Sequence, residues 1–141
     1  MPTRVEFELA AAQFDQAAND VASLAANVDG IDTSQVLVGG TLGQAAPLRI
    51  EAAAANARTC QMHIEAAAQT CRERAAIIVA YEAELAQYEL ASHRYHQLAH
   101  HWTVRYNRWW RSLGSMPHPG ARPVPPVAPA APPAWADVRR P

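Results

Sequence analysis

The sequence predicts an all-α fold, an antiparallel helical hairpin whose second helix is very long. The stretch between Pro47 and Leu113 contains no internal Gly or Pro. An apolar residue recurs about every seven positions through it, which is typical of a long helix packed against other helices. A shorter segment near the N-terminus has the same repeat. We therefore expect residues 1–113 to form the hairpin, and a coiled coil or four-helix bundle to form on assembly.

The first helix is predicted over residues 4–28. Thr3 is a candidate N-cap, and Glu6 stands three residues later, as in a capping box. Apolar residues then recur at seven-residue spacing, at Phe7, Phe14, Val21 and Val28. Polar residues fill most of the opposite side. The helix is therefore amphipathic and is expected to end before Asp29-Gly30.

A loop is predicted over residues 29–46 because four glycines fall within it. A short strand at residues 35–38 is one reading of its apolar content, although a lone strand would have no partner. Pro47 suits the first turn of a helix, where its missing N–H is not needed. The second helix is therefore expected over residues 47–113.

The apolar seam of the second helix has two interleaved rows. One row begins at Ile50 and the other at Ala53, and only Arg74 and Ser92 interrupt them. At about 1.5 Å per residue this helix would span roughly 100 Å, against roughly 36 Å for the first. The first helix can therefore cover only about a third of the second, where the seam residues are small.

Beyond Ile78 the seam becomes large and aromatic. We call this set the aromatic stripe: Tyr81, Leu85, Tyr88, Tyr95, Trp102, Tyr106 and Trp109. An apolar patch of this size in water is typical of an interaction site. We expect the stripe to be an interface covered by a second copy, by a different helical partner, or by a kink that folds the helix back.

The C-terminal residues 114–141 are predicted to be a Pro/Ala-rich tail, disordered or of polyproline type. Nine of the eleven prolines lie in residues 117–141, and no apolar period survives there. Trp135 is the one aromatic residue of the tail. It is either a docking anchor or a solvated side chain.

Charge is unevenly distributed along the chain. Residues 1–89 hold twelve acids and five arginines, a balance of −7, whereas residues 90–141 hold seven arginines and one acid, a balance of +6. The two parts should attract each other, within or between molecules. Lysine is absent and alanine abundant, which indicates a GC-rich, actinobacterial genome.

Two polar groups in the second helix are candidate binding sites. Three histidines share one helix face and are candidate metal ligands, although no acid or Cys completes the set: His93, His96 and His100. Four arginines form a basic patch among aromatic residues: Arg94, Arg105, Arg108 and Arg111. This Arg/Trp segment, residues 94–111, could bind nucleic acid or a membrane surface. An acidic first half would repel both, and a protein interface is favoured.

No catalytic motif is present, so we expect a non-enzymatic protein without cofactor or small-molecule substrate. The glycines at positions 39, 40 and 43 lack the following Lys and Ser/Thr of a phosphate loop. The N-terminus lacks the apolar core of a signal peptide, and no apolar run is long enough to span a membrane. We therefore expect a cytoplasmic location unless a specialised system exports the chain.

The layout resembles the WXG-motif helical hairpins of actinobacterial type VII (ESX) secretion systems and their secretion-associated relatives. The resemblance covers residues 5–113: an Ala-rich helix, a Gly-containing turn and a longer helix. The turn carries Val38-Gly39-Gly40 in place of Trp-x-Gly, and the export signal, Tyr followed four residues later by an acid, is absent. The resemblance implies pairing with a copy or a related helical protein, a secreted substrate or toxin as a partner, and type VII export.

Overall fold

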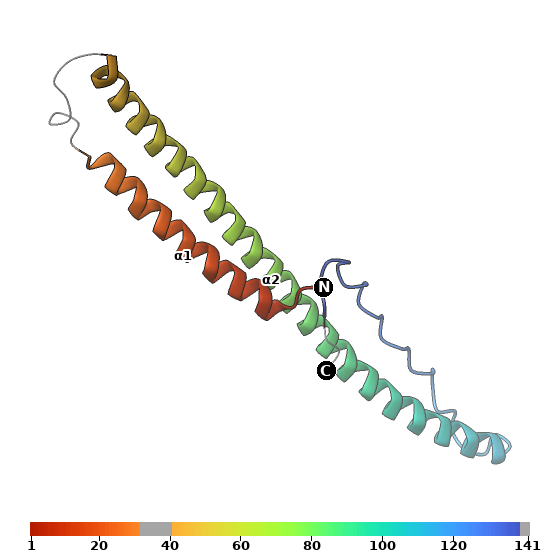
Figure 1. Cartoon of the computed structure of the whole chain (residues 1–141). Helices are drawn as coiled ribbons and strands as arrows, with labels where there is room; N and C mark the ends of the chain where they lie inside the picture. The colour runs from red at the N-terminus through yellow and green to blue at the C-terminus, as the bar shows by residue number, and fades with distance from the viewer. Residues whose placement is uncertain (32–40, 139–141) are drawn as a thin grey trace. The chain divides into compact units, whose positions relative to one another are not determined.

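The protein is a helical hairpin with a very long second helix, as the sequence predicted. The computed structural model describes residues 1–31 and 41–138, without the side chains of 41–44 and 46. Its two helices are α1 (Arg4–Asp29) and α2 (Thr41–Arg111). Figure 1 shows α1 lying antiparallel to the first part of α2. No helix among the described residues has a stretch long and apolar enough to cross a membrane.

The chain divides into two compact units. The hairpin unit contains Met1–Ile77 and Trp135–Asp137, and the distal unit contains Ile78–Ala134 with Val138. The second half of α2 is thus grouped with the tail. The sequence had grouped residues 78–113 with the hairpin and had treated the tail as a separate segment.

The start of α1 is fixed by the predicted capping box. The Thr3 hydroxyl accepts a hydrogen bond from the Glu6 backbone N–H at 3.4 Å, and the Thr3 backbone N–H donates to Glu6 Oε2 at 2.6 Å. Two backbone donors that the first helical turn cannot satisfy are thereby paired. At the other end the Gly30 N–H donates to the Ala26 carbonyl at 3.0 Å. The observed end differs from the predicted one by a single residue.

The start of α2 corrects the prediction. The helix begins at Thr41, six residues before the expected position, so the loop is shorter than 29–46 and Pro47 lies inside the helix. Proline lacks the N–H that would bond to the carbonyl four residues earlier, so α2 is one hydrogen bond short near its start. The strand considered at residues 35–38 lies outside the described residues.

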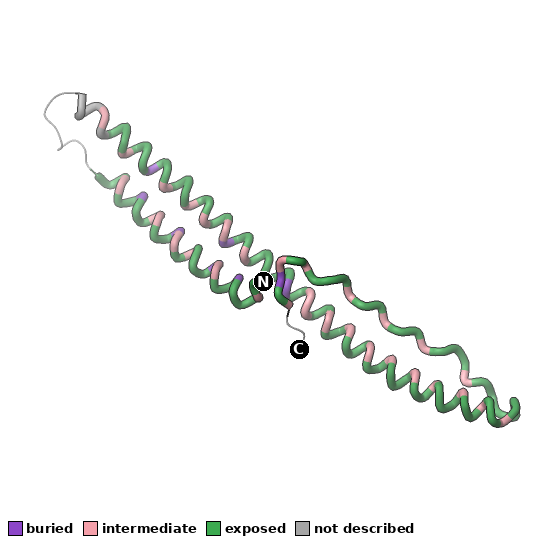
Figure 2. The backbone as a smooth tube through the Cα atoms, turned by 45° about the vertical axis from the view of Figure 1, so that its right-hand side comes forward, coloured by how far each residue is buried: buried purple, intermediate pink, exposed green. Residues whose placement is uncertain are grey.

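The two helices of the hairpin unit meet through alanines spaced by seven residues, except that Gln61 stands between Ala54 and Ala68. The buried alanines are Ala11, Ala18 and Ala25 on α1 and Ala54, Ala68 and Ala75 on α2, each 6 % exposed or less. Figure 2 shows these buried positions along the facing sides of the hairpin. Alanine lets two helices approach closely, because its side chain barely extends beyond the backbone.

The second predicted seam row is wrong over the hairpin. Ala53, Cys60 and Arg74 are exposed. Each stands one residue before a position of the buried alanine row, and one residue turns a helix by about 100°. These side chains therefore lie beside the contact line between the helices rather than on it.

Ion pairs mark one side of the hairpin. Arg58 pairs with Asp29, and Arg72 pairs with Asp15. All four residues stand four positions after a buried alanine, so they flank the contact line on the same side. Their side chains are 44–60 % exposed. Exposed pairs of this kind contribute little stability, so they orient the helices more than they hold them together.

After α2 the chain reverses through a turn. The Ser112 N–H donates to the Arg108 carbonyl at 3.1 Å, and Leu113 then has a φ of 52°. Gly114 follows with a φ of 85°. Positive φ is normal for glycine but strained for leucine, whose Cβ crowds the backbone.

Replacing Leu113 by glycine is expected to stabilise the turn by roughly 1 kcal/mol, because the strain disappears. The leucine side chain is 95 % exposed, so almost no packing is lost. Urea denaturation followed by circular dichroism would measure the gain. Leu113→Ala keeps the strain and serves as the control. If glycine stabilises no more than alanine, the left-handed conformation is not the source of strain.

The described part of the tail is extended, whereas the sequence left both disorder and a polyproline-type conformation open. Residues 117–138 are described as chain without helix or strand, apart from a short turn at 134–135. Figure 1 shows the part up to residue 134 returning as an extended segment beside the second half of α2. Sequence reasoning had allowed disorder because the tail lacks an apolar repeat. In the distal unit the tail lies against the aromatic surface of α2.

Candidate functional site

The aromatic stripe occupies one continuous face of α2 in the distal unit. All seven of its residues are half-buried, and most of the side chains between them are exposed. The face persists because α2 is continuous up to Arg111. Of the three covers considered from the sequence, the described residues contain no helix lying on the stripe. The chain's own tail lies along it, and pairing through the stripe with a second copy or another helical protein stays a prediction.

Prolines of the tail lie directly on the stripe. Pro129 lines a shallow depression together with Tyr81, Leu85 and Tyr88. Pro126 lines the neighbouring depression, again with Tyr88. The Tyr88 ring is therefore shared between two prolines three residues apart. Proline rings and tyrosine faces fit well, since both are apolar and conformationally stiff.

The far end of the stripe forms an aromatic cluster. The rings of Trp102 and Tyr106 stack with centroids 4.9 Å apart, and Trp109 follows at 5.6 Å from Tyr106. His118 of the tail meets Trp109 edge to face at 4.6 Å. The Trp102 Nε1–H donates to the Gly120 carbonyl at 3.1 Å. The cluster thus binds the beginning of the tail through both ring contacts and a hydrogen bond.

Gly120 permits this contact. Its φ of 88° is readily adopted only by glycine, and its N–H donates to His118 Nδ1 at 3.1 Å. The local turn between His118 and Gly120 directs the following prolines along α2. A residue with a Cβ would be strained at this position.

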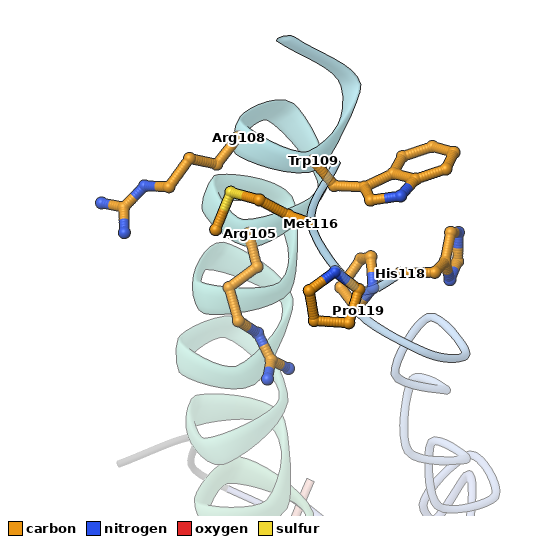
Figure 3. Close-up of a pocket in the computed structure, with 7 residues that line it drawn as sticks. Arg105, Arg108, Trp109, Met116, His118 and Pro119 are labelled. Atoms are coloured by element: carbon orange, nitrogen blue, oxygen red, sulfur yellow. The ribbon is translucent and has the colours of Figure 1, made fainter. Parts of the chain in front are cut away.

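The basic patch is brought together only in part. Arg105 and Arg108 line an open pocket of about 310 Å³ with Trp109, His118 and other tail residues. Figure 3 shows the Arg108 side chain pointing away from the Trp109 and His118 rings. The other two predicted members, Arg94 and Arg111, are exposed and do not line this pocket. Arg108 and Arg111 stand in the last turn of α2, where a cation is favoured by the helix dipole.

The histidine candidates do not form a metal site in the described part of the chain. His93, His96 and His100 are exposed. No group of three His, Cys, Asp or Glu residues among those described is placed to hold a metal ion. Tyr95 lies beside the His96 ring at 5.4 Å, as neighbours on one helix do.

Trp135 is a docking anchor in the hairpin unit. Its ring meets Phe7 edge to face at 5.7 Å. The Arg74 guanidinium carbon lies 5.3 Å from the Trp135 ring centroid and 5.8 Å from that of Phe7. Ala136 is buried, and the Asp137 N–H donates to the Pro2 carbonyl at 3.1 Å. Arg74, which interrupts the predicted seam, is therefore used as a cation between two rings.

Sequence reasoning missed the tail residues that contact the stripe. The signal that could have found them is the spacing Pro123, Pro126 and Pro129, one proline every third residue. That period matches the three residues per turn of a polyproline II helix. The aromatic residues of α2 supply the matching surface, which peptide-recognition domains use for such segments.

Comparison of the chain with protein-family models, with curated proteins and with solved structures found no match. The site must therefore be interpreted from its own geometry. That geometry offers two surfaces, which are the proline-covered stripe of the distal unit and the side of the hairpin unit opposite its ion pairs.

Proposed function

We propose that this chain is a non-enzymatic helical interaction protein whose hairpin unit pairs with a second copy to form a four-helix bundle. The observation that carries the proposal is the two-sidedness of the hairpin. On one side the ion pairs of Arg58 and Arg72 cross between the helices. The other side is largely apolar and has no such pairs among the described residues, and Arg74, which falls on it, lies against the Phe7 and Trp135 rings.

Helix geometry places this apolar side. Residues four positions after the buried alanines meet on the ion-pair side, so residues four before them meet on the opposite side. On α1 these are Phe14 and Val21, and on α2 they are Ile64 and Cys71. The residue directly before each buried alanine also lies on this side. This adds Leu24, which precedes Ala25 and is 58 % exposed. The apolar surface therefore spans both helices.

The two helices contribute unequal side chains to this surface. The α1 edge is large, with Phe14, Val21 and Leu24, whereas the α2 edge combines Ile64 with the smaller Ala53, Cys60 and Cys71. A twofold axis parallel to the helices would set the α1 edge of each copy against the α2 edge of the other. Large side chains would then fill the space above small ones, as in a well-packed helical interface. This complementarity favours a second copy as the partner.

The composition of the hairpin core supports pairing. The hairpin's own core is mostly alanine and contributes little hydrophobic stabilisation, so a partner would add much of the missing burial.

The proposal includes a cellular setting. The layout of α1, a Gly-containing turn and a longer α2 supports a role associated with a type VII (ESX) secretion system in an actinobacterium. In that setting the bundle would be exported or would accompany a secreted substrate or toxin. The absence of lysine and the abundance of alanine support the actinobacterial assignment.

Light scattering behind a sizing column tests the pairing. We expect the wild-type chain to have twice the 15.3 kDa monomer mass. Leu24→Glu with Cys60→Glu should reduce the mass to that of one chain, because charges would enter the apolar side. The control, Leu9→Glu with Met62→Glu, changes two residues that are also exposed but face away from that side, and it should stay dimeric.

A wild-type chain that is monomeric at every concentration would overturn pairing with a second copy. Equal loss of mass in both double variants would show that the apolar side is not the interface. A defined mass appearing only with a co-expressed helical protein would replace the second copy by that partner. Circular dichroism of each variant would show whether the helices are retained.

A further inference from the structure

We infer that the aromatic stripe of α2 is a recognition surface for proline-rich segments that carry a proline at every third residue. The chain's own tail occupies it within the distal unit and shows which features the surface reads. This inference is independent of the pairing proposed above, because it concerns other residues.

Burial along the tail repeats every three residues. Pro123, Pro126 and Pro129 are half-buried, whereas Val124 and Val127 between them are 84 % and 92 % exposed. A β-strand would alternate every second residue, but a polyproline II helix has three residues per turn. The surface therefore selects the prolines over the more apolar valines, which indicates that it reads the proline rings and their fixed backbone.

The rise of the tail agrees with this conformation. Gly120 bonds to Trp102, and Pro129 lies beside Leu85. Nine residues of polyproline II helix rise about 28 Å, and the corresponding seventeen residues of α-helix rise about 26 Å. The tail thus remains in register with α2 over this distance. A ligand in the same conformation would meet the same rings in the same order.

The contacts are of a kind that any proline-rich segment could make. A polyproline II helix has no internal hydrogen bonds, so its carbonyls are free to accept. In the tail, the Trp102 indole donates at 3.1 Å to the carbonyl of Gly120, which precedes the proline repeat. Tyr88 lines one depression with Pro126 and the next with Pro129. Stiff segments of this type lose little conformational entropy on binding. Recognition therefore does not require the covalent link between tail and helix.

The covalent link between tail and helix does determine how strongly the tail competes with other ligands for the stripe. A tethered segment has an effective concentration in the millimolar range, so the tail in cis would mask weaker ligands in trans. The binding experiment therefore uses the full chain with Pro123, Pro126 and Pro129 replaced by serine. This change weakens the tail on the stripe and leaves every stripe residue in place.

The probe is a fluorescein-labelled peptide of residues 117–134, and binding is measured by fluorescence polarisation. We expect the parent peptide to bind the serine-substituted chain. A peptide with Pro126→Ser and Pro129→Ser should bind at least tenfold more weakly, because its contacting prolines are gone. A peptide with Pro125→Ser and Pro132→Ser is the matched control, since both prolines are exposed in the tail, and it should bind nearly like the parent.

Tyr88→Ala in the serine-substituted chain should lower the affinity for the parent peptide by a similar factor. If circular dichroism shows that the serine-substituted chain has lost helix, the three peptides are titrated into the wild-type chain instead. The same ranking is expected there at higher concentrations, because the tail competes. Equal affinity of the two altered peptides, or no binding of the parent peptide to either chain, would overturn the inference.

Discussion

Replacing Ala68 by leucine is expected to lower the free energy of unfolding of the hairpin unit by roughly 1–3 kcal/mol. Ala68 is 0 % exposed and belongs to the alanine row through which α1 and α2 meet. A leucine there adds three carbon atoms where no space exists. The helices must move apart, and the neighbouring alanine contacts loosen with them.

Ala66 provides a matched control two residues away. It lies on the same helix but is exposed. Because Ala66→Leu makes the same change in helix propensity, the difference between the two variants isolates packing across the hairpin. Urea denaturation followed by far-UV circular dichroism, at one fixed protein concentration, would measure both. A stable Ala68→Leu variant would mean that the helices are not in close contact at this position.

The sequence was sufficient for the hairpin and for the bounds of α1. Thr3, Glu6 and Gly30 are local signals, and each makes the backbone or capping contact expected of it. The start of α2 was missed because the same reasoning took Pro47 as the first helical residue. Proline is favourable in the first turn of a helix, but its presence does not mean that the helix begins there. A helix that begins six residues earlier is therefore also compatible with Pro47.

The contact face of α2 could not be predicted because a run of alanines does not show which side of the helix packs. Residues 52–55 are all alanine, so the seven-residue repeat fits there in several registers. The choice is made by α1, whose own alanine row faces Ala54 and Ala68. A seven-residue repeat predicts the contact face of a helix only where the residues between the repeat positions differ from them in size or polarity.

The cover of the aromatic stripe was missed for a different reason. Sequence reasoning identified the stripe from the apolar repeat of α2 and sought another apolar repeat to match it. The tail has a repeat of prolines, with Val124 and Val127 turned outward. A polyproline segment contacts a surface through ring shape and backbone carbonyls, so its pattern is not visible in hydropathy.

Trp135→Ala is expected to lower the stability of the hairpin unit by roughly 2 kcal/mol, through loss of the aromatic pair with Phe7 and the cation–π contact with Arg74. The segment that follows is held by a buried Ala136 and by one backbone hydrogen bond from Asp137. Without the indole these contacts are too few to keep the segment docked. Urea denaturation would measure the loss. Trp110→Ala is the control, because that indole is 67 % exposed, and it should be nearly neutral.

A double-mutant cycle separates the contribution of the Arg74 charge to stability from that of the Trp135 ring. Arg74→Gln alone removes the charge, and Trp135→Ala alone removes the ring that lies 5.3 Å from it. If the guanidinium is stabilised by the ring, the two losses should not add, and the coupling should be about 0.5–1 kcal/mol. Additive losses would contradict a cation–π role and leave Arg74 as a solvated side chain beside the seam. A measured coupling would explain why an apolar row contains a charge: the arginine attaches the end of the tail to the start of α1.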